Sequence, residues 1–220
     1  MIEVLGVSWC IAVLLVIDAL LHKHNEKVRW YAIHCMTNAA VVITTAPNVY
    51  RFMTEFNPQF RYAILFPSVL IMSLHIFHCL FFNTNRQDII HHVVMSLVLL
   101  IPLYNSDNVQ FVAFSNYALF FLSGLPGGID YFLMTMVESG KMDRLTEKYY
   151  NQYLNTWVRS IGILYGVFCC YQQWLMGAVQ ACWAWPAILA MTWNAQYYSS
   201  QVAQSYGFHA GKQSVAKASS

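Results

Sequence analysis

The chain has 220 residues, of which 58% are apolar and only 10% are charged, and its mean hydropathy is +0.43. A soluble domain has about 25% charged residues, so a water-soluble globule of this length would lack the polar residues needed to cover its surface. The formal net charge of +2 is too small to indicate nucleic acid as a partner. The composition therefore predicts an all-α, polytopic membrane protein.

The apolar residues are grouped into segments of membrane-spanning length. A bilayer core about 30 Å thick needs roughly 20 apolar residues per helix. Seven such segments follow one another, at about 3–21, 30–50, 61–82, 89–104, 109–137, 152–172 and 174–199. We expect an N-terminal anchor helix with a basic loop (1–27), a six-helix membrane domain (28–200) and a flexible polar tail (201–220).

The fifth segment contains an interruption, Gly124-Leu125-Pro126-Gly127-Gly128. Glycine and proline both disfavour a helix interior. One possibility is a broken backbone at membrane depth, which survives only where protein or a water-filled cavity satisfies its polar groups. The other is that the span ends at Ser123 and that 129–137 lies at the membrane interface.

The basic residues are distributed unequally between the two predicted sides. Arg51 and Arg61 lie on the N-terminal side, and Arg159 lies within a span. The other side carries Lys23, Lys27, Arg29, Arg86, Lys141, Arg144, Lys148, Lys212 and Lys217. Because Lys and Arg accumulate on the cytoplasmic side, we expect the N-terminus outside and the C-terminus in the cytosol or mitochondrial matrix. The expected location is the endoplasmic reticulum, with the mitochondrial inner membrane or another organelle as alternatives.

The six cysteines all lie in apolar segments, and none has CxxC spacing. Buried free thiols behave as small hydrophobic groups. We expect neither a disulfide framework nor a cysteine zinc site. No metal or other cofactor is expected, apart from a bound lipid or acyl chain.

Histidines gather in the third and fourth spans. His75 and His78 share one helix face, and a short loop separates them from His91 and His92, so these spans are expected to be neighbours. Such imidazoles suit acid/base chemistry, although interhelical hydrogen bonding is the simpler reading. Adjacent helical residues point about 100° apart, so one of His91 and His92 is expected to face the bundle interior. Asp88 is the expected N-cap.

Ionisable residues at membrane depth usually face the bundle interior and often mark function. Arg159 is the one Arg deep in a span, and Asp130 is its expected partner in an ion pair. The alternative is that Arg159 anchors a lipid phosphate or carboxylate, which its planar guanidinium fits. The candidate lipid-binding residues are Arg159, Asp130, His34, His75 and His78, and the candidate catalytic residues are His91 and His92.

Four stretches of the sequence together resemble the TLC-domain family, which includes ceramide synthases, translocon-associated membrane proteins and lipid regulators. They are Lys27-Val28-Arg29-Trp30 with Ile33-His34-Cys35, Arg86-Gln87-Asp88-Ile89-Ile90-His91-His92-Val93-Val94, Asp130-Tyr131-Phe132-Leu133, and Asn155-Thr156-Trp157-Val158-Arg159. The second resembles the Asp-x-x-His-His motif of the family. The resemblance covers about 28–199 and implies a six-helix barrel around a lipid-sized cavity.

The departures from that family concern its catalytic set. The resemblance implies a His-Asp pair and further acidic residues on the fifth helix, where this chain has Asp130 and no His. Acyl transfer to an amine needs a base and stabilisation of an oxyanion. We therefore expect a lipid-handling or lipid-sensing protein without ceramide synthase activity.

Three other functions remain open. The chain could be an acyltransferase that uses His91 or His92 as its base and Arg159 as an anion anchor. It could be a structural subunit that packs between other membrane-protein subunits, since it has no soluble domain. A weaker alternative is a histidine-bound metal or haem. The expected partners are membrane lipids and other membrane subunits.

Overall fold

The computed structural model describes residues 2–55 and 59–218, with side chains for 5–55 and 59–215. Residues 1, 56–58 and 219–220, which include the last two of the predicted tail, lie outside this description. The described chain forms seven continuous helices and no strand, as the sequence predicts. They are α1 (Ile2–Leu20), α2 (Glu26–Thr54), α3 (Phe66–Phe81), α4 (Arg86–Tyr104), α5 (Val109–Leu119) continued by η1 (Phe120–Gly124) and α6 (Leu125–Glu138), α7 (Arg144–Tyr153) continued by η2 (Leu154–Arg159) and α8 (Ser160–Leu175), and α9 (Ala181–Ala218).

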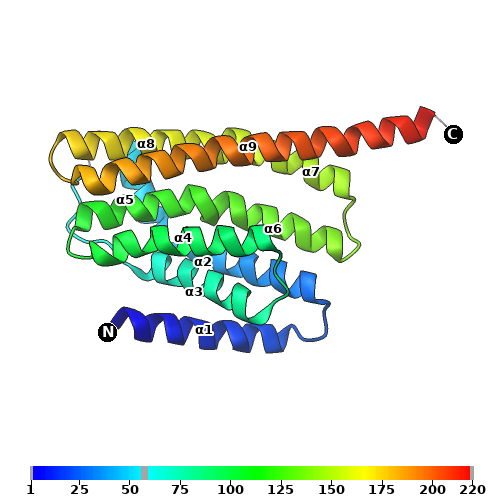
Figure 1. Ribbon diagram of the computed structural model, residues 1–220, viewed down its shortest axis with the longest axis horizontal. Helices are drawn as coiled ribbons and strands as arrows, with labels where there is room; N and C mark the ends of the chain where they lie inside the picture. The colour runs from blue at the N-terminus through cyan, green and yellow to red at the C-terminus, as the bar shows by residue number, and fades with distance from the viewer. Residues whose placement is uncertain (1, 56–58, 219–220) are drawn as a thin grey trace.

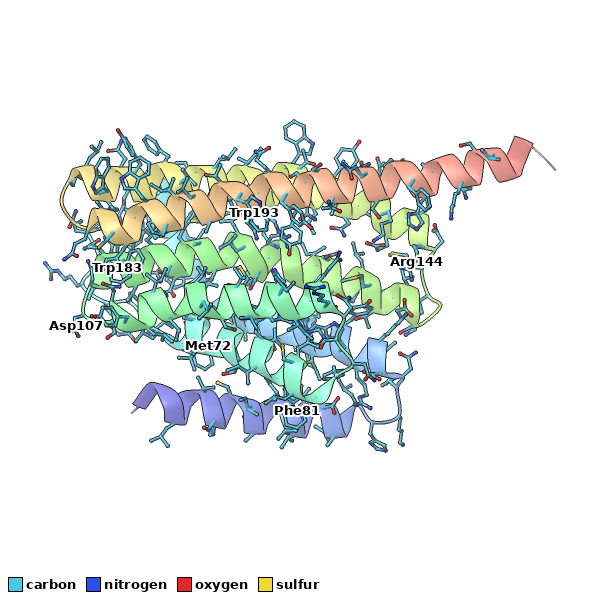
Figure 2. All side chains as sticks on the ribbon, in the orientation of Figure 1. Met72, Phe81, Asp107, Arg144, Trp183 and Trp193 are labelled. Atoms are coloured by element: carbon cyan, nitrogen blue, oxygen red, sulfur yellow. The ribbon has the colours of Figure 1, made fainter. Side chains whose placement is uncertain are left out.

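The helices lie side by side in an up-and-down bundle (Figure 1). α2 is central and packs against α6, η1, α5 and α3, while α8 and α7 pack against α9. α1 lies at one edge, mainly against α3, and α4 packs mainly on α3. Figure 2 shows Asp107 and Trp183 at the end where the N-terminus lies and Arg144 at the opposite end. The connections beside Lys23, Arg86 and Lys141 share that opposite end, as the alternation of seven helices requires.

The Gly-Leu-Pro-Gly-Gly sequence lies within a continuous helix, so both predicted alternatives, a broken backbone and a helix end at Ser123, were wrong. The helix absorbs Pro126 through the π-helical turn η1, in which the amide of Leu125 donates to the carbonyl of Phe120. Gly127 then allows α6 to approach α2, because a Cβ at this position would lie 2.9 Å from Nδ2 of Asn38. The glycines therefore serve close helix packing.

Two segments without predicted helices are helical. Within the polar loop 138–150, α7 begins at Arg144, with Asp143 as its N-cap. α9 continues through the predicted flexible tail as far as Ala218. That segment is rich in Ala, Gln, Ser and Lys and has no proline after Pro186, so its local propensity permits a helix although it has little apolar surface to bury.

The helices differ in whether they are long and apolar enough to cross a membrane. Among the described residues, α4 and the continuous helix Val109–Glu138 are both long and apolar enough to cross a membrane. Leu5–Leu20 and Phe66–Phe81 are shorter apolar helices. Large hydrophobic side chains are nevertheless exposed around the bundle, including Leu97 on α4 and Trp157 on η2. The helix count agrees with the sequence, while seven membrane spans remain a prediction.

Candidate functional site

A cavity of about 140 Å³ lies inside the bundle, toward the end that carries Arg144. Its walls come from α2, α3, α4, α5, η1, α6, η2 and α9. Six of the seven predicted site residues line it: His34, His75, His91, His92, Asp130 and Arg159. The expectation that costly polar groups from several spans meet in one interior pocket is therefore confirmed as geometry.

The seventh predicted residue, His78, lies just behind this wall. Its Nδ1 shares a short hydrogen bond with Nε2 of His92, fourteen residues along the chain. The rings of His75 and His92 are also adjacent, with centroids 4.6 Å apart. The expectation that α3 and α4 are neighbours with converging imidazoles is correct, because a four-residue connection holds the two helices together.

His91 and His92 both line the cavity, and both rings lie beside His75 of α3, but their hydrogen bonds go to different helices. His92 is buried against His78 and His75 of α3, whereas Nδ1 of His91 shares a hydrogen bond of 3.1 Å with the hydroxyl of Tyr198 on α9. Their 100° separation along α4 therefore lets one ring form its hydrogen bond with α3 and the other with α9. Asn85 and not Asp88 caps α4: its side chain accepts from the amide of Asp88 and donates to the Asp88 carboxylate.

Arg159 and Asp130 do not form the predicted ion pair. Both line the cavity, yet among the residues the structure describes no nitrogen of Arg159 lies within 4.0 Å of an Asp130 oxygen. Arg159 instead lies over the ring of Tyr198, 5.3 Å from its centroid, and its Nε has no hydrogen-bond partner. Oδ1 of Asp130 is likewise buried and unpartnered. Arg159 on η2 and Asp130 on α6 thus face the same cavity without a direct ion pair between them in the described part of the chain.

Uncharged polar residues that the sequence reasoning missed complete the cavity wall. Asn38, Asn155, Asn194 and Tyr198 line it from α2, η2 and α9. The three asparagines lie in predicted spans, so a search for all polar residues at membrane depth, and not for ionisable ones alone, would have found them. Tyr198 carries no such signal, because tyrosine is common throughout this chain.

A second pocket opens at the same end of the bundle. Trp30 and His78 line it together with Glu26, Asn83 and Glu138. The indole of Trp30 stacks on the ring of His78, and His78 in turn contacts His92 in the inner cavity. Trp30 and His78 thus form the wall between the outer pocket and the inner cavity. His34 is held behind them by a hydrogen bond to the carbonyl of Trp30.

An apolar groove adjoins the polar cavity on its other side. It runs between α4, α5 and α9, and five residues line both spaces: Met95, Leu99, Leu119, Leu122 and Asn194. The remaining wall is almost entirely aliphatic and aromatic, and includes Val94, Phe114, Ala118 and Ala190. The polar cavity and the apolar groove therefore lie side by side and share these five residues.

The enclosed space is smaller than the resemblance implies. The groove adds about 100 Å³ to the cavity of about 140 Å³, whereas pockets that enclose drug-sized ligands measure about 300–1,000 Å³. Buried aromatic side chains such as Tyr117, Phe114 and Phe52 fill the rest of the bundle. The two spaces are therefore smaller than a pocket that encloses a whole drug-sized molecule.

Comparisons with known proteins add no family assignment: the chain matches no family model, no curated protein and no solved structure. The resemblance to the TLC-domain family consequently rests on the four motifs alone and remains a prediction.

Proposed function

We propose that this chain is a multi-pass, TLC-like membrane protein that binds one amphiphilic lipid, with an anionic head group at Arg159 and its chain in the α4–α5–α9 groove. The observation that carries the proposal is Arg159 itself. It is a buried cation that lacks an ion-pair partner among the described residues, and it lines a cavity that shares five lining residues with an apolar groove. A buried cation of this kind is costly unless an anion compensates it.

The surface of the bundle supports a membrane location for this binding. Val93, Val94, Leu97 and Leu100 on α4 are all exposed, next to the groove that α4 partly closes. Apolar surface of this kind is unusual on a soluble monomer. In this proposal the lipid head group enters the polar cavity and its acyl chain passes between α4 and α9. The part of the chain that the groove cannot hold remains in the bilayer.

The direct test is lipid analysis of the full-length protein purified from membranes in mild detergent. Native mass spectrometry is expected to show one bound anionic amphiphile per chain. Arg159→Gln should abolish its retention, and Arg159→Lys should restore part of it. The matched control is Arg51→Gln, since Arg51 is already paired with Glu55. A wild-type protein without stoichiometric lipid, or equal losses in both Gln variants, would refute the proposal.

Acyl transfer is a second candidate, which one contact favours. Tyr198 and Nδ1 of His91 share a hydrogen bond, and in the tautomer in which Nδ1 donates, Nε2 of His91 is free to act as a general base. The purified protein should be assayed with acyl-CoA and a long-chain amine or lysolipid. Turnover that is unchanged in His91→Gln and His92→Gln would exclude these residues as bases. A lipid-free protein that copurifies with other subunits would instead support the structural role.

A further inference from the structure

Three of the histidines in the cavity wall are arranged as the ligands of one metal ion. One ring nitrogen from each of His75, His91 and His92 lies within 4.8 Å of the other two. Around a tetrahedral Zn²⁺, with bonds of about 2.0–2.1 Å, such nitrogens lie ~3.4 Å apart. Small rotations of side chains already adjacent on α3 and α4 close this difference.

The remaining ring nitrogens of two of these histidines are already engaged. Nδ1 of His91 pairs with the Tyr198 hydroxyl, and Nε2 of His92 pairs with His78. Each contact orients its ring and leaves the opposite nitrogen available. Metal-ligating histidines almost always use their second nitrogen for such an orienting hydrogen bond.

The nitrogens that this arrangement leaves free include two that are buried and unpartnered. Nδ1 of His92 and Nδ1 of His75 are both inaccessible and have no hydrogen-bond partner among the described residues. Buried polar atoms are nearly always satisfied, and a bound ion is one established explanation for an exception. The clustering of the three rings and the unpartnered nitrogens of two of them are therefore two observations that point to the same three histidines.

The donor set and the available space indicate which ions would bind. Three imidazoles with no thiolate among them suit Zn²⁺ and neighbouring first-row divalent ions. The adjoining cavity of about 140 Å³ has room for a water molecule or a ligand oxygen at a fourth position. A haem, the other alternative considered for these histidines, is too large for this space.

We infer that His75, His91 and His92 bind one divalent transition-metal ion of the Zn²⁺ type. Its fourth coordination position opens to the cavity that Arg159 and Asp130 also line. This departs from the expectation, drawn from the cysteines, that the protein has no metal. The inference rests on the three histidines and not on the proposed lipid, so either can fail alone.

The test is metal stoichiometry on the full-length protein in detergent, after treatment with a chelator and dialysis against Zn²⁺. Elemental analysis is expected to give one Zn²⁺ per chain, and Co²⁺ substitution should give the intense visible absorption of a tetrahedral site. His75→Gln, His91→Gln and His92→Gln should each lose the ion. The matched control is His34→Gln, because His34 is buried in the same wall but lies outside the triad.

Two further measurements keep the inference falsifiable if a variant misfolds. X-ray absorption of the Zn²⁺-loaded wild type should show three imidazole ligands and requires no variant. A double variant, His22→Gln with His24→Gln, removes exposed histidines and should leave the stoichiometry at one. No bound Zn²⁺, a spectrum without three imidazoles, or equal loss in His34→Gln and His75→Gln would overturn the inference.

Discussion

The hydroxyl of Tyr198 on α9 shares a 3.1 Å hydrogen bond with Nδ1 of His91 on α4, although 107 residues separate them in the chain. The ring of Tyr198 also lies beside the guanidinium of Arg159. One side chain thus connects the histidine cluster with the buried cation. It also ties α4, which packs mainly on α3, to the opposite wall of the cavity.

Removing this hydroxyl should loosen the orientation of His91 while leaving the ligand in place. For Tyr198→Phe we expect Zn²⁺ affinity to fall about 10- to 100-fold, with one ion still bound at saturation. Equilibrium dialysis over a range of free Zn²⁺ measures this. Tyr197→Phe is the control, because Tyr197 is exposed and stacks on Trp193. An unchanged affinity in Tyr198→Phe would show that the hydroxyl does not position His91.

The groove can be blocked without touching the polar residues. Ala190→Phe adds a ring to a residue that lines the groove and should displace the lipid chain, so that bound lipid falls while Zn²⁺ binding persists. Leu189→Phe makes a similar addition one residue away, at an exposed position on the same helix. Native mass spectrometry of both variants gives the comparison. Equal lipid retention in the two would place the chain outside this groove.

Close packing between the helices η1 and α8 depends on Gly162. A Cβ there would lie 2.0 Å from Cδ1 of Phe121, so the ring and its neighbours would have to move. Gly162→Ala is expected to destabilise the protein by about 1–3 kcal/mol, which is typical of overpacking in a dense core. Thermal unfolding in detergent measures the loss.

The matched control for this substitution is Gly207→Ala on α9. A Cβ at Gly207 meets nothing within 4 Å. Alanine should therefore leave the helix unchanged or stabilise it by about 0.5–1 kcal/mol. If the two variants unfold at the same temperature, the Phe121 ring moves aside without cost, and close packing at Gly162 does not stabilise the protein.

The outer pocket should respond to acid through Glu26. Its carboxylate accepts from the backbone amide of Asn83 at 2.8 Å and from the Asn83 side chain at 3.1 Å. These bonds lower the pKa of Glu26 below its ordinary 4.5. Because the folded-state pKa is depressed, the link stabilises the fold above that ordinary value and is lost as the pH falls through the folded-state pKa.

The corresponding measurement compares the unfolding temperature of the wild type with that of Glu26→Gln as the pH is lowered from neutral through the pKa of Glu26. The wild type should be the more stable near neutral pH, and the difference should shrink as Glu26 is protonated. In an Asn83→Ala background, the pH-dependent effect of Glu26→Gln should shrink but persist, since the side-chain amide is lost while the backbone amide of residue 83 still donates to Glu26. A difference that is constant with pH would mean that the carboxylate charge does not hold this connection.

The number and type of helices followed from the sequence, because apolar runs separated by short polar segments leave few other arrangements. The bounds differ at the helix ends: α7 and the extension of α9 to Ala218 go beyond the predicted segments, whereas α3 begins at Phe66 and α9 at Ala181, later than the predicted 61 and 174. The error at Gly124–Gly128 has a different cause: local propensity disfavours a helix there, but a π-helical turn and close contact with Asn38 compensate.

The ionisable residues of the cavity wall could be named from the sequence, since polar groups within apolar helices turn inward and few such groups exist, whereas its asparagines and Tyr198 were missed. The spacing of the histidines also determined that α3 and α4 are neighbours. Which side chains contact one another in the site depended on the tertiary structure. It left Arg159 and Asp130 in one cavity without a direct ion pair among the described residues, joined Tyr198 to His91, and brought three imidazole nitrogens to within 4.8 Å of one another. The reason is that the rotation of each helix about its axis, including the shifts introduced by η1 and η2, depends on packing between residues far apart in the chain.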